Sequence, residues 1–156
     1  MVIGNDLVRA VAVGPVVIVR FMVPPTGEVA DQVLQLTEKT RVATQDRLSF
    51  VGVVGHGLEM PSAEFRSKLA AQGSTIKGNA ASIHFVIEGD GFMPRLQRGM
   101  IGAIAGVVAI GVPVQIHKDV AEALRAVQTL RGVALAELEA GARRAGIIFD
   151  PEAEIG

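Results

Sequence analysis

The fold is decided by residues 82–115, which read SIHFVIEGDGFMPRLQRGMIGAIAGVVAIGVPVQ. An apolar run of strand length opens the stretch, and Gly89 and Gly91 permit a sharp reversal because glycine tolerates positive φ. An apolar helical segment follows, and Gly111 and Pro113 mark its end before a second apolar run. The stretch therefore predicts one βαβ unit with two buried strands.

The flanking segments extend this unit into an α/β sheet. Apolar runs and turn residues predict strands at 6–13, 16–22, 48–54, 80–87 and 112–116. Helical spacing predicts helices at 27–44, between Ser62 and Gly73, from 92 to near Gly111, from 120 to Gly132 and at 134–145. The first two strands form an antiparallel hairpin, and right-handed crossovers make the rest parallel. We expect a mostly parallel five-stranded sheet in β-β-α-β-α-β-α-β-α order over residues 1–132, with a C-terminal helical extension and tail at 133–156.

Composition excludes several classes of function. The 156 residues suit one domain, and with 49% hydrophobic but only 4% aromatic residues the core must be aliphatic. A net charge of −1 provides no field for nucleic acid. The absence of Cys excludes disulfides and thiolate sites and fits a reducing cytosol, so a cytoplasmic protein is expected. No cofactor, metal site or catalytic residue is assigned.

An uncharged segment at 99–116 raises the alternative of a membrane span. Gly102 and Gly106 have the G-x-x-x-G spacing of helices that associate in lipid. Gly111 and Pro113 interrupt the segment, however, and a helix followed by a short strand explains the same residues. We therefore expect no membrane span.

The predicted layout resembles the STAS fold of anti-sigma-factor antagonists and sulfate-transporter tails. Two motifs make it similar to uncharacterised bacterial STAS-like proteins: Gly89-Asp90-Gly91-Phe92 before the apolar helix, and the sequence VQIHKDVAEAL at 114–124. Phosphorylation-switched STAS domains carry Ser or Thr, preceded by Asp, at the start of the second helix. The resemblance thus implies Ser62 as a phospho-switch, although Pro61 replaces the acid and Ser62 is also explained as a helix N-cap.

Polar residues gather where parallel strands are predicted to end. His56 and His117 follow two strands, and Glu88 and Asp90 follow a third, so all four are predicted at the carboxyl edge where open α/β sheets bind ligands. A His/carboxylate enzyme site is conceivable there, although no spacing demands it. Gly89-Asp90-Gly91 fits a turn better than a phosphate cradle, because Asp90 would repel phosphate. His84, within a strand, is interpreted as a core histidine.

The apolar helix carries Phe92, Leu96, Met100, Ile104 and Val107 in one stripe, with a small-residue stripe beside it: Gly99, Gly102 and Gly106. The glycines indicate either close packing on the sheet or a surface for a homodimer or protein partner. The leading hypothesis is a non-catalytic regulatory module that binds a protein partner. A binder of small molecules or acyl chains is the second, and an enzyme with a His/carboxylate site is the third.

Overall fold

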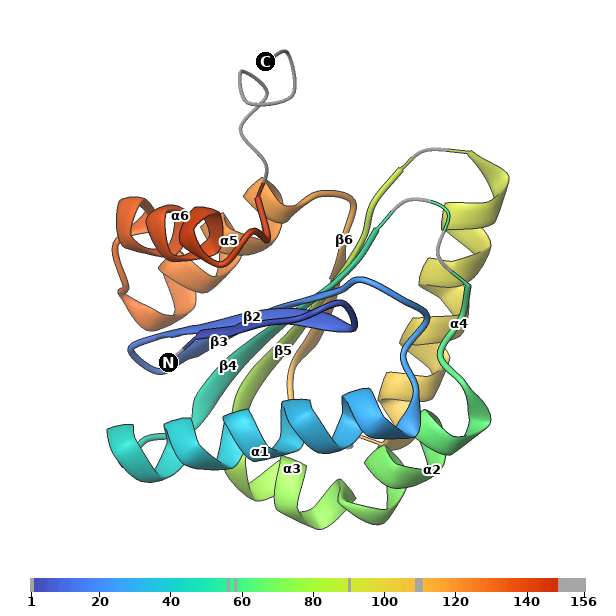
Figure 1. Cartoon of the computed structure of the whole chain (residues 1–156), viewed down its shortest axis with the longest axis horizontal. Helices are drawn as coiled ribbons and strands as arrows, with labels where there is room; N and C mark the ends of the chain where they lie inside the picture. The colour runs from blue at the N-terminus through green and yellow to red at the C-terminus, as the bar shows by residue number, and fades with distance from the viewer. Residues whose placement is uncertain (1, 56, 58, 90, 109–110, 149–156) are drawn as a thin grey trace.

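A computed structural model describes residues 2–55, 57, 59–89, 91–108 and 111–148. They form an α/β fold around one mixed sheet whose strands lie side by side in chain order (Figure 1). The strands are β1 (Val2–Gly4), β2 (Val8–Val13), β3 (Val16–Phe21), β4 (Leu48–Val54), β5 (Ala80–Ile87) and β6 (Val114–His117). Pairing is antiparallel from β1 to β3 and parallel from β3 to β6. The α/β class is confirmed, but the sheet has six strands instead of five.

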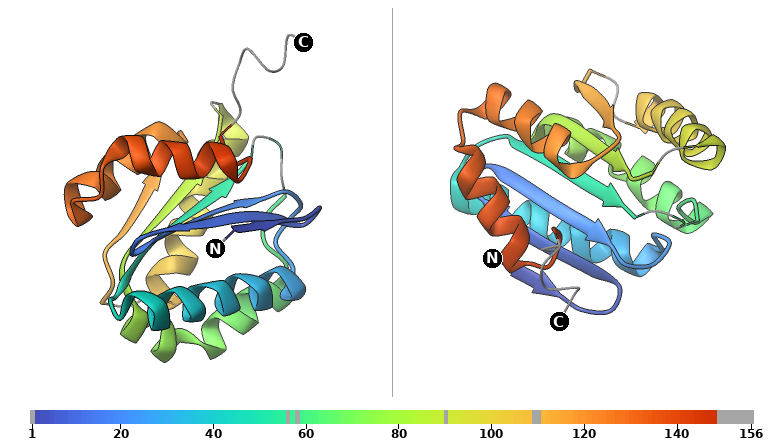
Figure 2. Two further views of the ribbon diagram at one scale, coloured as in Figure 1. Left: turned by 60° about the vertical axis from the view of Figure 1, so that its left-hand side comes forward. Right: turned by 90° about the horizontal axis from the view of Figure 1, so that it is seen from above.

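The helices divide between the two faces of this sheet. They are α1 (Gly27–Thr44), α2 (Ala63–Ala71), α3 (Gly73–Asn79), α4 (Phe92–Val108), α5 (Val120–Arg131) and α6 (Leu135–Arg144). Each connection between two parallel strands moves in the same direction along the sheet. Because such connections are right-handed, α1 to α4 lie on the same face. The chain crosses to the other face after β6, where α5 and α6 pack (Figure 2).

Because side chains along a strand point alternately to the two faces of the sheet, each face has its own hydrophobic core. On β3, the side chains of Val17 and Val19 pack toward α1, while those of Val16 and Ile18 pack toward α5 and α6. All six residues of β3 are buried, because this strand is covered on both faces. Ile147 also packs into the core beneath α5 and α6, so residues beyond 132 contribute to the core on this face of the sheet.

Local capping explains why several helix boundaries agree with the sequence. Thr26, Ser62 and Asp119 each accept a hydrogen bond from the backbone N–H three residues further on, which satisfies one free donor of the first turn. The N-cap predicted at Ser62 is confirmed. At the other end of α1, Gln45 adopts a left-handed conformation with φ of 54° and donates its N–H to the Arg41 carbonyl.

Three predicted details are wrong. β1 was not expected, and it adds an edge strand through three residues paired only with β2. Gly73 does not end the helical region: the chain turns at Gln72 and α3 begins at Gly73. His117 does not follow the last strand but is its final residue, paired with Val86 of β5. Among the described residues, no helix is long and apolar enough to cross a membrane.

Candidate functional site

His117 lies beneath α5 and not in an open crevice. Its side chain is 6% exposed and contacts His84 of β5, which is completely buried. The two rings are joined by a hydrogen bond of 3.1 Å between His84 Nδ1 and His117 Nε2. His84 is therefore a core histidine, as predicted, but its link to His117 was not foreseen.

The histidine pair belongs to a chain of hydrogen bonds that ends on an exposed carboxylate. His117 Nδ1 lies 3.2 Å from Glu122 Oε1, and His84 Nε2 lies 3.1 Å from the Ser82 hydroxyl. The Ser82 hydroxyl in turn lies 2.7 Å from that of Ser49. An ionised carboxylate can only accept hydrogen bonds. With both rings neutral, every donor in the chain therefore points toward Glu122: Ser49 donates to Ser82, Ser82 to His84, His84 to His117, and His117 to Glu122.

The environment keeps His84 neutral. Burial first, and then repulsion by a charged His117, together lower its pKa from 6.5 to about 4. Ser49 and Ser82 are also buried, so no substrate reaches this end of the chain. The arrangement therefore acts as a satisfied polar network inside the core.

Glu88 is engaged elsewhere. Its carboxylate accepts two hydrogen bonds from the guanidinium of Arg20, at 2.6 and 3.1 Å, and Arg20 Nε donates to the Ile147 carbonyl at 2.7 Å. This bidentate pair fixes the end of β5 to β3 and to the segment after α6. His56 and Asp90 lie outside the described residues, so a shared His/carboxylate site stays a prediction.

The topology also removes the reason for expecting a crevice at the carboxyl edge. Ligands bind at that edge where successive crossovers depart to opposite faces of the sheet. Here the strands follow chain order, and all three parallel crossovers lie on one face. Among the described residues, no group of three or more His, Asp or Glu side chains could hold a metal ion.

Ser62 and the glycines of α4 have clear structural surroundings. The Ser62 hydroxyl accepts a hydrogen bond from the Phe65 N–H at 3.1 Å, and phosphorylation there stays a prediction. A Cβ added at Gly99 or Gly102 would meet no heavy atom within 4 Å. The close-packing interpretation is therefore wrong at these two positions, while the surroundings of Gly106 lie outside the described residues.

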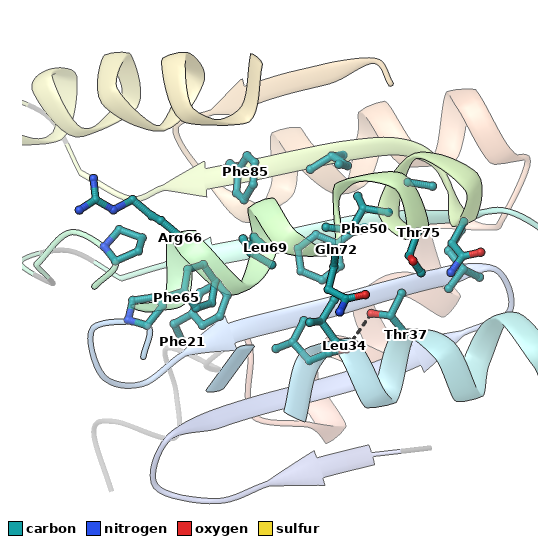
Figure 3. A pocket seen from close by; sticks show the side chains of 18 of the residues that line it. Phe21, Leu34, Thr37, Phe50, Phe65, Arg66, Leu69, Gln72, Thr75 and Phe85 are labelled. Atoms are coloured by element: carbon teal, nitrogen blue, oxygen red, sulfur yellow. Dashed lines mark hydrogen bonds between the residues drawn. The ribbon is translucent and has the colours of Figure 1, made fainter. Parts of the chain in front are cut away.

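An apolar cavity of about 310 Å³ opens on the opposite face of the sheet from the histidines. Its floor is formed by β3, β4 and β5, and α1, α2 and α3 surround it (Figure 3). Ile101 of α4 also lines it. The apolar lining residues are Phe21, Pro25, Val33, Leu34, Leu48, Phe50, Val54, Pro61, Phe65, Leu69, Ile76, Ala80, Ile83, Phe85 and Ile101. Volume and lining match those of small-molecule sites.

Phenylalanine is concentrated in this cavity. The chain has six Phe and neither Trp nor Tyr, and four of the six line the cavity. The rings of Phe21, Phe50 and Phe85 gather over Gly52, where an added Cβ would lie 3.0 to 3.5 Å from them. Phe65 of α2 meets Phe21 edge to face, with ring centroids 5.9 Å apart. Gly52 thus makes room for the aromatic floor.

Polar groups stand only at the rim of the cavity. Arg66 lies at one end in Figure 3, and Thr37, Gln72 and Thr75 lie toward the other. The Thr37 hydroxyl is already bound to the Val33 carbonyl at 2.8 Å. The site can therefore bury an aliphatic or aromatic body and leave a polar group at the surface.

No protein-family model, no curated protein and no solved structure matches this chain. Function is therefore argued from the site alone. Sequence reasoning missed the cavity because its lining comes from seven helices and strands spread along the chain. The signal that could have indicated it was the placement of four Phe residues on three strands and one helix of a chain otherwise poor in aromatics.

Proposed function

We propose that this protein binds a small apolar molecule or acyl chain in the cavity between the sheet and α1 to α3. The observation that carries the proposal is the cavity itself, about 310 Å³ of apolar space. Well-packed interiors contain few voids larger than a water molecule. A cavity of this size without polar groups in its interior does not hold ordered water, so an apolar ligand is the occupant that stabilises it.

Methyl NMR with a neutral probe tests the proposal. On addition of 1-decanol, the methyl signals of Ile83 and Leu69 in the cavity shift, while those of Leu138 on the opposite face do not. Leu69→Trp fills the cavity and abolishes the shifts. Leu135→Trp, which enlarges a half-buried leucine packed on the opposite core, is the matched control and leaves them unchanged. Equal shifts on both faces, or undiminished binding by Leu69→Trp, would contradict the proposal.

A second role is favoured by the outer face of α4. Met93, Leu96 and Met100 are 58%, 45% and 43% exposed, and Gly99 lies beside this stripe with open space around it. This uncharged surface is the kind that associates with another protein, and the small Gly99 allows a second helix to approach closely. We propose that it mediates self-association, in keeping with a STAS-like regulatory module that acts through protein contacts.

Light scattering after size exclusion tests this second role. The chain is expected to form dimers as its concentration rises, and Leu96→Glu is expected to return it to a monomer. Leu130→Glu changes an equally exposed leucine on α5 and serves as the control. A strict monomer at every concentration would rule out self-association through α4.

A further inference from the structure

Among the described residues, one cation at the rim of the cavity has no ion-pair partner. Two basic residues project from the middle of α2, and Lys68 is already neutralised by Asp31 at 2.7 Å and Glu64 at 3.9 Å. The Arg66 side chain lines the cavity, and within the described part of the chain it makes no hydrogen bond or ion pair. Its five N–H donors are therefore available to a bound molecule.

Glu38 also lines the cavity, but Arg41 balances its charge. Glu38 accepts hydrogen bonds from Arg41 at 2.9 Å and from Asn79 at 3.2 Å. The Arg41 guanidinium holds the pKa of the Glu38 carboxyl below its ordinary value, so this group stays ionised at neutral pH. An anionic ligand is thus attracted to Arg66, the rim cation that lacks a partner among the described residues, and not to Glu38, whose charge Arg41 balances. This fixes the direction in which a chain with one acidic end enters.

The volume sets the length of the chain. An apolar cavity of about 150 Å³ holds the six carbons of benzene. The cavity here is about 310 Å³, roughly twice that size, and so accommodates about twelve carbons. Leu69 and Phe50 lie between the Arg66 end and the Thr75 end in Figure 3, so an extended aliphatic chain contacts apolar side chains along the cavity.

We propose that the ligand is a straight-chain monocarboxylate of about ten to twelve carbons, with its carboxylate on Arg66 and its chain in the cavity. This inference rests on the proposed apolar-ligand function and assigns the ligand its polar end. The planar guanidinium matches a carboxylate in a bidentate geometry. A single cation balances the single charge of a carboxylate but leaves a phosphate monoester, with nearly two charges, partly uncompensated.

Calorimetric titration with n-decanoate and 1-decanol tests separately whether the cavity binds an apolar chain and whether Arg66 binds the carboxylate. The ligands share a ten-carbon chain and differ only in the end group. Arg66→Gln is expected to weaken decanoate binding by about tenfold and to leave decanol binding unchanged. Lys68→Gln removes a neighbouring cation that is already paired, and is expected to alter neither. Decanoate affinity should also fall with added salt, while decanol affinity does not.

The outcomes are distinct. If neither ligand binds the wild-type protein, the proposed function itself fails. If decanol binds but decanoate binds no more tightly, or if Arg66→Gln weakens both ligands equally, the cavity is confirmed and the carboxylate assignment is overturned. Tighter binding of decyl phosphate than of decanoate would also overturn it. Unchanged decanol binding shows that Arg66→Gln remains folded.

Discussion

Acidification should destabilise this protein through His84. The pKa of His84 is about 4 in the folded state, against 6.5 for an exposed histidine. The unfolded chain therefore takes up this proton first as the pH falls. The contribution of His84 to stability is fully present above pH 6.5 and is lost as the pH falls toward 4.

The magnitude follows from the two pKa values. At about 1.4 kcal/mol per pKa unit, the full difference amounts to about 3 kcal/mol. Most of it, about 2.5 kcal/mol, is lost between pH 7.5 and 4.5. The groups facing the ring are neutral or distant: Ser82, a His117 that repels when charged, and Glu122 beyond His117. Within the described ranges, no carboxylate contacts His84 directly to offset the cost of its protonation.

Urea unfolding at pH values between 7.5 and 4.5 measures this effect. His84→Gln keeps a polar side chain for Ser82 and His117 but cannot titrate, so its stability should fall less with pH than that of the wild type. The readout is the slope of unfolding free energy against pH and not its absolute value, because the substitution disturbs two hydrogen bonds at every pH. Parallel pH dependence in the two proteins would refute the reasoning.

Substitutions at four further positions test an ion pair, the packing of two helices and one helix cap. Glu88→Gln should cost about 2 kcal/mol in urea unfolding, because buried Arg20 loses its charged bidentate partner. Gly141→Ala should cost about 1–3 kcal/mol, since its Cβ would lie 2.5 Å from a side chain of β2, whereas Gly102→Ala in open space should stabilise by about 0.5–1 kcal/mol. Ser62→Ala should lower stability by about 1 kcal/mol, and Ser62→Asp should retain the cap.

A specific result would contradict each of these predictions. A cost below about 0.5 kcal/mol for Glu88→Gln would show that the pair is loose in solution. Equal effects of alanine at the two glycines would mean that α6 does not approach β2 as closely as the structure has it. Equal losses from both Ser62 substitutions would assign that residue a role other than capping.

Features set by local sequence were predicted well. The bounds expected for α1, β4 and β5 agree with the structure, because caps, apolar alternation and glycine lie within or beside each segment. Features set by pairing with distant residues were not. β1 exists only through its contact with β2, and β6 extends to His117 because of its register with Val86.

In the candidate site, too, local features were predicted and features that depend on distant residues were not. The sequence identified two apolar or small-residue stripes on α4, but not that Leu96 and Met100 face outward. It placed His117 near a strand end without revealing the ring of His84 opposite it. The positions of four Phe residues hinted at the cavity, but its volume could not be predicted, because that volume depends on how far α1, α2 and α3 stand from the sheet.

A crystal structure under xenon pressure tests the central claim most directly. Xenon enters apolar cavities without requiring a particular ligand. We expect xenon density between the sheet and α1 to α3, in contact with Leu48, Leu69 and Ile83, and none between the sheet and α5. Side chains closed over this space, with no xenon in it, would contradict the account.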